Sequence, residues 1–146
     1  MEISILALPL IASIISGFFG KFIGDRNSEI ITSLLVSISA IFSGLVLYEV
    51  IVNQYQDNIV IATWISSGSL EVNWSMKIDS LSAVMLVVVT SVSALVHVYS
   101  IGYMSHDPHK PRFMAYLSLF TFAMLMLVTS DNFIQLFFGW EGVGLC

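Results

Sequence analysis

Long runs of apolar residues, separated by short polar turns, dominate the hydropathy pattern of this chain. Each of the three longest runs exceeds about 17 residues, the length that an α-helix needs to cross the hydrocarbon core of a membrane. The pattern predicts about five transmembrane helices, with the fifth cut short, at residues 3–22, 29–52, 79–101, 113–129 and 131–146. The fold class is therefore an all-α polytopic membrane protein, and we expect residues 1–146 to form a single membrane domain fragment.

Residues 53–78 depart from the helical pattern. Residues 59–65 are β-branched and aromatic, residues 66–69 are turn-like, and apolar and polar residues alternate strictly from Leu70 to Lys77. A period of two on either side of a Gly/Ser turn is typical of a β-hairpin. We expect an extramembrane β-hairpin at residues 59–76, between the second and third helices.

Small residues recur three or four apart along the first two predicted helices and into the turn between them. The first set is Ser16, Gly20 and Gly24, and the second, in the second helix, is Ser33, Ser37, Ala40 and Gly44. Such stripes let helix backbones approach closely within a membrane, so these two helices are expected to form a helical hairpin. Residues 24–28 are predicted to be the turn between them, with Ser28 as the cap of the second helix.

The composition agrees with a membrane protein and excludes several functions. Charged residues make up 10% of the chain and apolar residues 57%, whereas soluble domains carry about 25% charged residues. The net charge is −5, and no cluster of Lys and Arg is present to bind the phosphates of a nucleic acid. No glycine-rich nucleotide loop occurs either.

No metal or cofactor site is predicted in this chain. Its one cysteine, Cys146, permits no internal disulfide. His106, Asp107 and His109 are potential ligands, but they share a polar loop with nothing opposite them. Pro108 and Pro111 are expected to act as helix breakers in this loop, which spans residues 102–112.

The distribution of cations predicts the orientation. Lys21 and Arg26 lie in the first loop, and Lys110 and Arg112 lie in the third, whereas the hairpin holds only Lys77. Four of the five cations therefore share one side, which the positive-inside rule assigns to the cytoplasm or matrix. The N-terminus and the hairpin would then face the outer, periplasmic or intermembrane, side.

Glu141 is the leading candidate for chemistry. A helix that begins at Asp131 would carry this carboxylate about 15 Å along its axis, near the middle of a hydrocarbon core of about 30 Å. An ionised carboxylate costs at least about 2.5 kcal/mol there, so Glu141 is interpreted as a proton carrier. The neighbouring glycines 139, 142 and 144 are expected to let water or another helix approach it. The alternative is a static hydrogen bond that ties helices together, the kind of structural role favoured for Gln135.

Asp79 and His97 are secondary candidates for a proton pathway. Asp79 precedes Ser80 and Ser82, a pattern that favours a helix cap over a pathway role. His97 lies about one turn from the far end of the third predicted helix. A histidine with satisfied hydrogen bonds near the membrane interface is the competing interpretation.

The run Phe-Phe-Gly-Trp-Glu-Gly-Val-Gly-Leu-Cys at residues 137–146 closely resembles the fifth-helix signature of a known family. This family is the large antiporter-like subunit of respiratory complex I, NADH:quinone oxidoreductase, called subunit L in bacteria and subunit 5 in mitochondria. The resemblance extends in order through residues 78–82, 97–100, 103–108, 112–113, 116–120 and 131–132, and so covers essentially the whole chain.

The resemblance implies a translocase subunit of the respiratory electron-transport chain that couples quinone reduction by NADH to proton pumping. Glu141 matches the family's essential glutamate, which works with a lysine on the seventh helix. The family implies no redox centre in this chain; NAD, FMN, iron–sulfur clusters and quinone (ubiquinone) would bind to other subunits. Its partners would be other membrane subunits of complex I and the lipid bilayer, and its location a bacterial plasma membrane or a mitochondrial inner membrane.

Family members have many more helices, so we expect this fragment to be inactive alone and to lack the partner lysine of Glu141. Two alternatives remain open from the sequence. One is the related large subunit of a multi-subunit cation/proton antiporter, and the other is a non-transporting structural membrane fragment.

Overall fold

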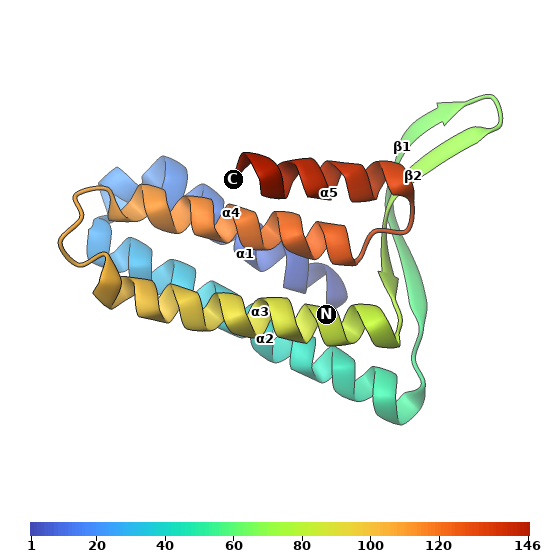
Figure 1. Cartoon of the computed structure of the whole chain (residues 1–146), viewed down its shortest axis with the longest axis horizontal. Coiled ribbons are helices and arrows are strands. Elements are labelled where there is room, and N and C mark those ends of the chain that lie inside the picture. The colour runs from blue at the N-terminus through green and yellow to red at the C-terminus, as the bar shows by residue number, and fades with distance from the viewer.

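A computed structural model describes all residues, 1–146, and contains five helices and one two-stranded sheet. The elements are α1 (Glu2–Ile23), α2 (Asp25–Asn53), β1 (Asp57–Ser67), β2 (Leu70–Ile78), α3 (Ser80–Tyr103), α4 (Lys110–Val128) and α5 (Phe133–Leu145). The helices run roughly parallel or antiparallel in one bundle, and the hairpin leaves one end of it (Figure 1). The predicted fold class is confirmed.

Four of the helices, α1 to α4, are long and apolar enough to cross a membrane, and α5 is a shorter apolar helix. Their outward surfaces are apolar: Phe18 is 78% exposed, Phe22 88% and Leu95 72%. Many of the residues buried between the helices are instead Ser, Thr or His. This inside-out distribution of polarity suits a bundle surrounded by lipid, where polar side chains find their partners inside the protein. The chain is a membrane protein.

The turn between α1 and α2 is shorter than predicted. Gly24 reverses the chain alone, with a φ of 92° that glycine tolerates and other residues rarely adopt. Residues 25–28 therefore already belong to α2, which begins four residues before the predicted start. The prediction of Ser28 as a helix cap is wrong: Ser28 is buried, and its Oγ lies 2.6 Å from Ser16 Oγ of α1.

Pro108 lies in the turn between α3 and α4, as predicted, but Pro111 acts differently from the prediction. Pro111 lies in the first turn of α4, which begins at Lys110. A proline fits this position because backbone N–H groups in the first turn have no partner within the helix. At the other end of the bundle, α5 begins at Phe133 and not at Asp131, because the Asn132 side chain caps it by accepting from Gln135 N–H at 2.8 Å.

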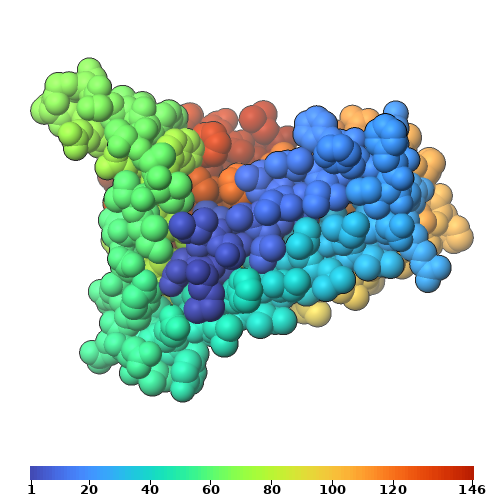
Figure 2. Space-filling view, turned by 180° about the vertical axis from the view of Figure 1, so that it is seen from behind, coloured from blue at the N-terminus to red at the C-terminus, as the bar shows by residue number.

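The small residues of α1 bring it against two neighbours. Helices α1 and α2 are adjacent, as predicted (Figure 2). Gly17 and Gly20, however, face α4: a Cβ on Gly17 would lie 3.5 Å from Ala115, and one on Gly20 would lie 2.6 Å from Pro111. The Ser16 hydroxyl is also 2.6 Å from the Pro111 carbonyl oxygen. The stripe therefore joins α1 to α4 as much as to α2.

The hairpin forms as predicted, with an antiparallel register that pairs Ser67 with Leu70 and places Gly68 at a φ of 61° in the turn. Its base packs on the bundle. Lys77 N–H donates to the Thr129 carbonyl oxygen at 2.9 Å, and the tip projects beyond the helices (Figure 1).

Gln135 of α5 fastens the base of the hairpin. It is fully buried, its Nε2 donates to the Ser75 carbonyl oxygen at 2.7 Å, and its Oε1 accepts from Ser75 N–H at 3.1 Å. Trp74 stacks on Trp64 at 4.6 Å between ring centroids and meets Phe138 of α5 edge-on at 4.8 Å. The hairpin and α5 therefore form one unit at this end of the bundle, and the structural role predicted for Gln135 is the one observed.

Candidate functional site

Glu141 lies on α5, which packs against α4 and touches the hairpin but meets no other helix of the chain closely. It follows the helix start at Phe133 by eight residues, or about 12 Å along the axis. The adjacent Gly142 lies against Ala123, five residues before the end of α4. Glu141 is thus within the apolar length of the bundle, nearer its hairpin end than predicted because α5 begins two residues later.

The face of α5 that carries Glu141 is not covered by this chain. Gln135 and Gly139, the buried residues of α5, mark the opposite face. Glu141 is exposed, as are the large apolar side chains of Phe137, at 61%, and Leu145, at 86%. Glu141 takes part in neither of the two salt bridges of the structure.

Two of the three glycines near Glu141 serve helix packing. A Cβ on Gly139 would lie 2.8 Å from the Leu127 backbone nitrogen, and one on Gly142 would lie 3.1 Å from the Ala123 Cβ. They let another helix, α4, approach α5 as expected, but on the face of α5 that points away from the Glu141 carboxylate. Of the three, only Gly144 has open space around it: a Cβ added there would meet no atom of the chain within 4 Å.

His97 of α3 is fully buried where this helix packs against α4. Its Nδ1 is 2.7 Å from the Ser93 carbonyl oxygen, which can only accept, so Nδ1 carries the proton. Its Nε2 lies 3.0 Å from Ser118 Oγ and accepts from that hydroxyl when the ring is neutral. The imidazole is thus satisfied on both sides, about 9 Å along the axis from the end of α3 at Tyr103.

His97 belongs to a line of polar side chains that we call the polar seam. The seam consists of Ser43 of α2, Thr90, Ser93 and His97 of α3, and Ser118 and Thr121 of α4. The hydroxyls of Ser93 and Thr121 contact each other, and those of Ser43 and Thr90 lie 2.7 Å apart one turn further on. The stretch from His97 to Thr90 covers about 10 Å of α3. Hydroxyl and imidazole groups both donate and accept, but no hydrogen bond joins the Ser43–Thr90 pair to the group around His97, so the seam consists of two hydrogen-bonded groups one turn apart.

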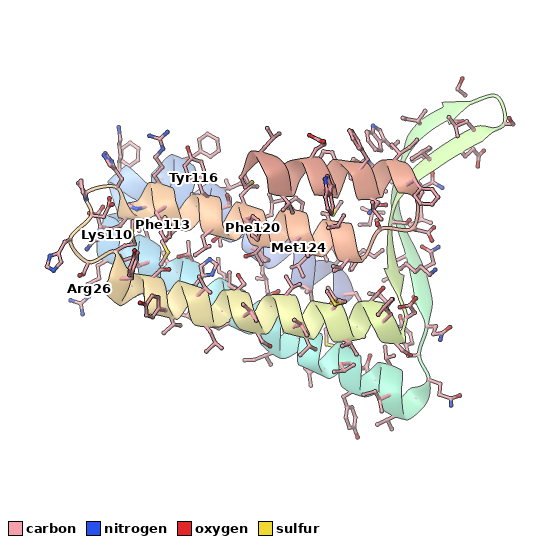
Figure 3. All side chains as sticks on the ribbon, in the orientation of Figure 1. Arg26, Lys110, Phe113, Tyr116, Phe120 and Met124 are labelled. Atoms are coloured by element: carbon pink, nitrogen blue, oxygen red, sulfur yellow. The ribbon has the colours of Figure 1, made fainter.

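Glu29 and Lys110 form a pair that the sequence did not single out. Glu29 is 4% exposed, and its Oε1 lies 4.0 Å from Lys110 Nζ, at the end of the bundle opposite the hairpin. Lys110 and Arg26 lie at this end in Figure 3. Glu29 Oε1 and Ser33 Oγ, one turn further into the bundle, are both buried without a hydrogen-bond partner. The charges of the two residues were visible in the sequence, but their meeting depends on how α2 and α4 are rotated.

Asp79 caps α3. Its Oδ1 accepts from Ser82 N–H at 2.8 Å, and this hydrogen bond lowers the pKa of the Asp79 carboxyl. Asp79 and His97 lie eighteen residues apart on one helix, about 27 Å. The structure does not bring Glu141, His97 and Asp79 together into one cluster.

No group of three or more His, Cys, Asp or Glu side chains is arranged to hold a metal ion. The fold and these sites define a polytopic membrane protein with a buried imidazole–hydroxyl seam and a lone carboxylate on an apolar helix.

Comparisons with known proteins identify the family within this class of membrane protein. The family described as NADH-ubiquinone oxidoreductase (complex I), chain 5 N-terminus, matches residues 64–114. NADH-ubiquinone oxidoreductase chain 5 of Arabidopsis thaliana is 56% identical over 99% of this chain, and that of Phytophthora infestans is 53% identical over 99%. The chain 5 of Metridium senile is 51% identical over 100%. The chain belongs to the complex I chain 5 family, and it spans 22 to 24% of the length of these relatives.

Proposed function

We propose that this chain contributes to proton translocation by complex I and that Glu141 carries the proton. The observation that supports this most is an exposed carboxylate on an apolar helix, with no partner in the chain. The names of the relatives favour complex I over the cation/proton antiporter.

The cost of burial makes the charge of Glu141 responsive to its surroundings. Left facing lipid, its ionised form is disfavoured by at least about 2.5 kcal/mol. A cation or water brought against it restores the ionised form. Movement of such a partner therefore loads and releases a proton, and the partner comes from residues beyond this sequence or from another subunit.

The polar seam is the second part of the proposal. His97 is the one titratable group in the seam, and we assign it to a proton route through the bundle. For Asp79 we propose the cap alone, because its carboxylate already accepts the Ser82 N–H.

The surroundings of the chain follow from the same proposal. The electron-carrying groups NAD, FMN, iron–sulfur clusters and quinone belong to other subunits, and the chain contacts other membrane subunits of complex I. We place the chain in a mitochondrial inner membrane or a bacterial plasma membrane. The end with Arg26 and Lys110 faces the matrix or cytoplasm, and the N-terminus and hairpin face the outer side.

Cysteine labelling tests this orientation. In a background without Cys146, Ser67→Cys and His106→Cys are expected to react with an impermeant reagent from opposite faces of the membrane. Reaction from the same face would contradict it.

The function is tested with Glu141→Gln in the complete, assembled complex. The glutamine keeps the size of the side chain but cannot release a proton, so proton pumping is expected to fall at least about tenfold while the complex still assembles. Glu71→Gln, on the exposed hairpin, is the matched control and leaves pumping unchanged. Unchanged pumping in Glu141→Gln, with assembly intact, would mean that Glu141 has only a structural role.

A further inference from the structure

A cleft opens between α1 and α4 at the end of the bundle that carries the α3–α4 loop. Its volume is about 710 Å³. Leu10, Ile14 and Phe18 of α1 and Leu119 of α4 give it apolar walls, and Ser16 lies in its lining where the two helices touch.

The loop end of this cleft is basic. Lys21, His109 and Arg112 line it, with Asp25 as the one carboxylate. Neither Lys21 nor Arg112 takes part in a salt bridge. The cleft thus holds two unpaired cations, Lys21 and Arg112, and only one carboxylate, Asp25. This excess of positive charge favours an anionic ligand.

The arginine is held in place for such a contact. Arg112 Nε donates to Tyr116 Oη at 3.0 Å, and its guanidinium carbon lies 5.6 Å from the centre of the Tyr116 ring. Tyr116 lies on α4 close to the loop end (Figure 3). These contacts fix the side chain but use neither Nη group, and the Nη groups form the fork that matches a phosphate.

We propose that this cleft binds an anionic phospholipid, with the phosphate at Lys21 and Arg112 and an acyl chain along the apolar wall. Three features favour a lipid over free phosphate. The cleft lies on α1 and α4, both long and apolar enough to span the membrane. It continues from the basic end onto apolar side chains that offer a free ion nothing, and Phe18 on its wall is 78% exposed. Basic clefts between helices on the cytoplasmic or matrix side suit anionic headgroups. The proposal is independent of the role of Glu141.

Photocrosslinking in the complete complex tests it. The complex is reconstituted into phosphatidylcholine vesicles that contain a diazirine-bearing phosphatidylglycerol, and labelled peptides of α1 and α4 are measured by mass spectrometry. The Lys21→Gln/Arg112→Gln double variant is expected to lose labelling by about tenfold or more, since each cation near an anionic membrane contributes appreciably to lipid binding.

The controls separate the possible outcomes. Lys77→Gln removes a cation at the other end of the bundle and leaves labelling unchanged, and the charge-preserving Lys21→Arg/Arg112→Lys variant retains most of it. Three results would overturn the proposal. They are equal labelling of the wild type and the double variant, equal labelling by a diazirine-bearing phosphatidylcholine, and loss of labelling on addition of inorganic phosphate at constant ionic strength, which would show a simple anion site.

Discussion

The polar seam and the free face of α5 hold ionisable groups in opposite ways. In the seam, His97 is fully buried and both of its ring nitrogens have partners from α3 and α4. On α5, Glu141 is exposed among large apolar side chains, and no residue of the chain pairs with it. The seam therefore finds its hydrogen-bond partners within the chain, whereas Glu141 has no ionic partner in it.

This contrast separates two tasks. A satisfied imidazole among hydroxyls holds helices together with partners that the chain itself supplies. A carboxylate whose surroundings are supplied from outside the chain can change its charge when those surroundings change. Substitutions in the complete complex, in detergent or membranes, distinguish how each region is held.

The largest effect is expected from Gln135→Leu, which breaks the link between α5 and the hairpin. The substitution leaves the buried N–H and C=O groups of Ser75 without partners, at a cost of about 1–3 kcal/mol each. Faster proteolysis of the hairpin and a lower thermal transition are the expected results. Asn58→Ala removes an exposed hydrogen bond to Asp131 and is the control with little effect. Equal stability of the two variants would contradict this account of how α5 is attached.

Gly139→Val tests the close approach of α5 to α4. A Cβ there would lie 2.8 Å from the Leu127 backbone nitrogen, and overpacking of this kind costs about 1–3 kcal/mol. The assembled complex is expected to unfold at a lower temperature. Gly144→Val, where a Cβ meets nothing within 4 Å of this chain, is the comparison. A larger loss at Gly144 would mean that the free face of α5 is the more tightly packed one.

His97→Leu tests the seam. Replacing the ring removes the bonds to Ser118 and Ser93 and is expected to cost about 1–2 kcal/mol, because Leu fills much of the space. Thermal unfolding measures this loss, and His106→Leu on the exposed loop is the control. A proton-route role for His97 also predicts slower pumping at equal assembly. Normal pumping in a stable His97→Leu complex would limit the seam to structure.

The smallest effect concerns the cap of α3, the helix that carries the seam. Hydrogen bonding from Ser82 N–H lowers the folded-state pKa of Asp79, so its stabilising contribution is present above the unfolded pKa of about 3.9 and is lost as the pH falls through the lower folded value. Asp79→Ala is expected to cost about 0.5–2 kcal/mol at neutral pH. The difference between wild type and variant is expected to shrink in acid. A difference that stays constant as the pH falls would contradict the cap.

Much of the fold could be predicted because membrane thickness sets the length of an apolar helix. Hydropathy located all five helices, the alternation after Leu70 located the hairpin, and the Asp79–Ser82 spacing located a cap. The start of α2 could not be predicted in the same way. It depends on a single backbone reversal at Gly24, and a glycine in a polar stretch does not reveal that conformation.

The sequence identified individual candidate residues, but it did not predict which side chains contact one another. The sequence singled out Glu141 and His97 because ionisable groups in apolar helices are costly. Three contacts were not predicted because each joins residues on separate elements. They are the His97–Ser118 hydrogen bond, the Glu29–Lys110 ion pair and the hydrogen bonds between Gln135 and Ser75. Such contacts depend on how each helix is rotated about its own axis. A membrane helix that is apolar on all sides gives little indication of that rotation in its sequence.

Infrared difference spectroscopy of the complete complex during turnover tests the central claim most directly, because it observes the protonation of the carboxyl group itself. A carboxyl C=O band that appears or disappears on reduction by NADH, is absent in Glu141→Gln and persists in Glu71→Gln is the predicted result. A spectrum of Glu141→Gln that keeps every carboxyl band of the wild type would show that Glu141 does not change its protonation state, and would contradict its role as the proton carrier.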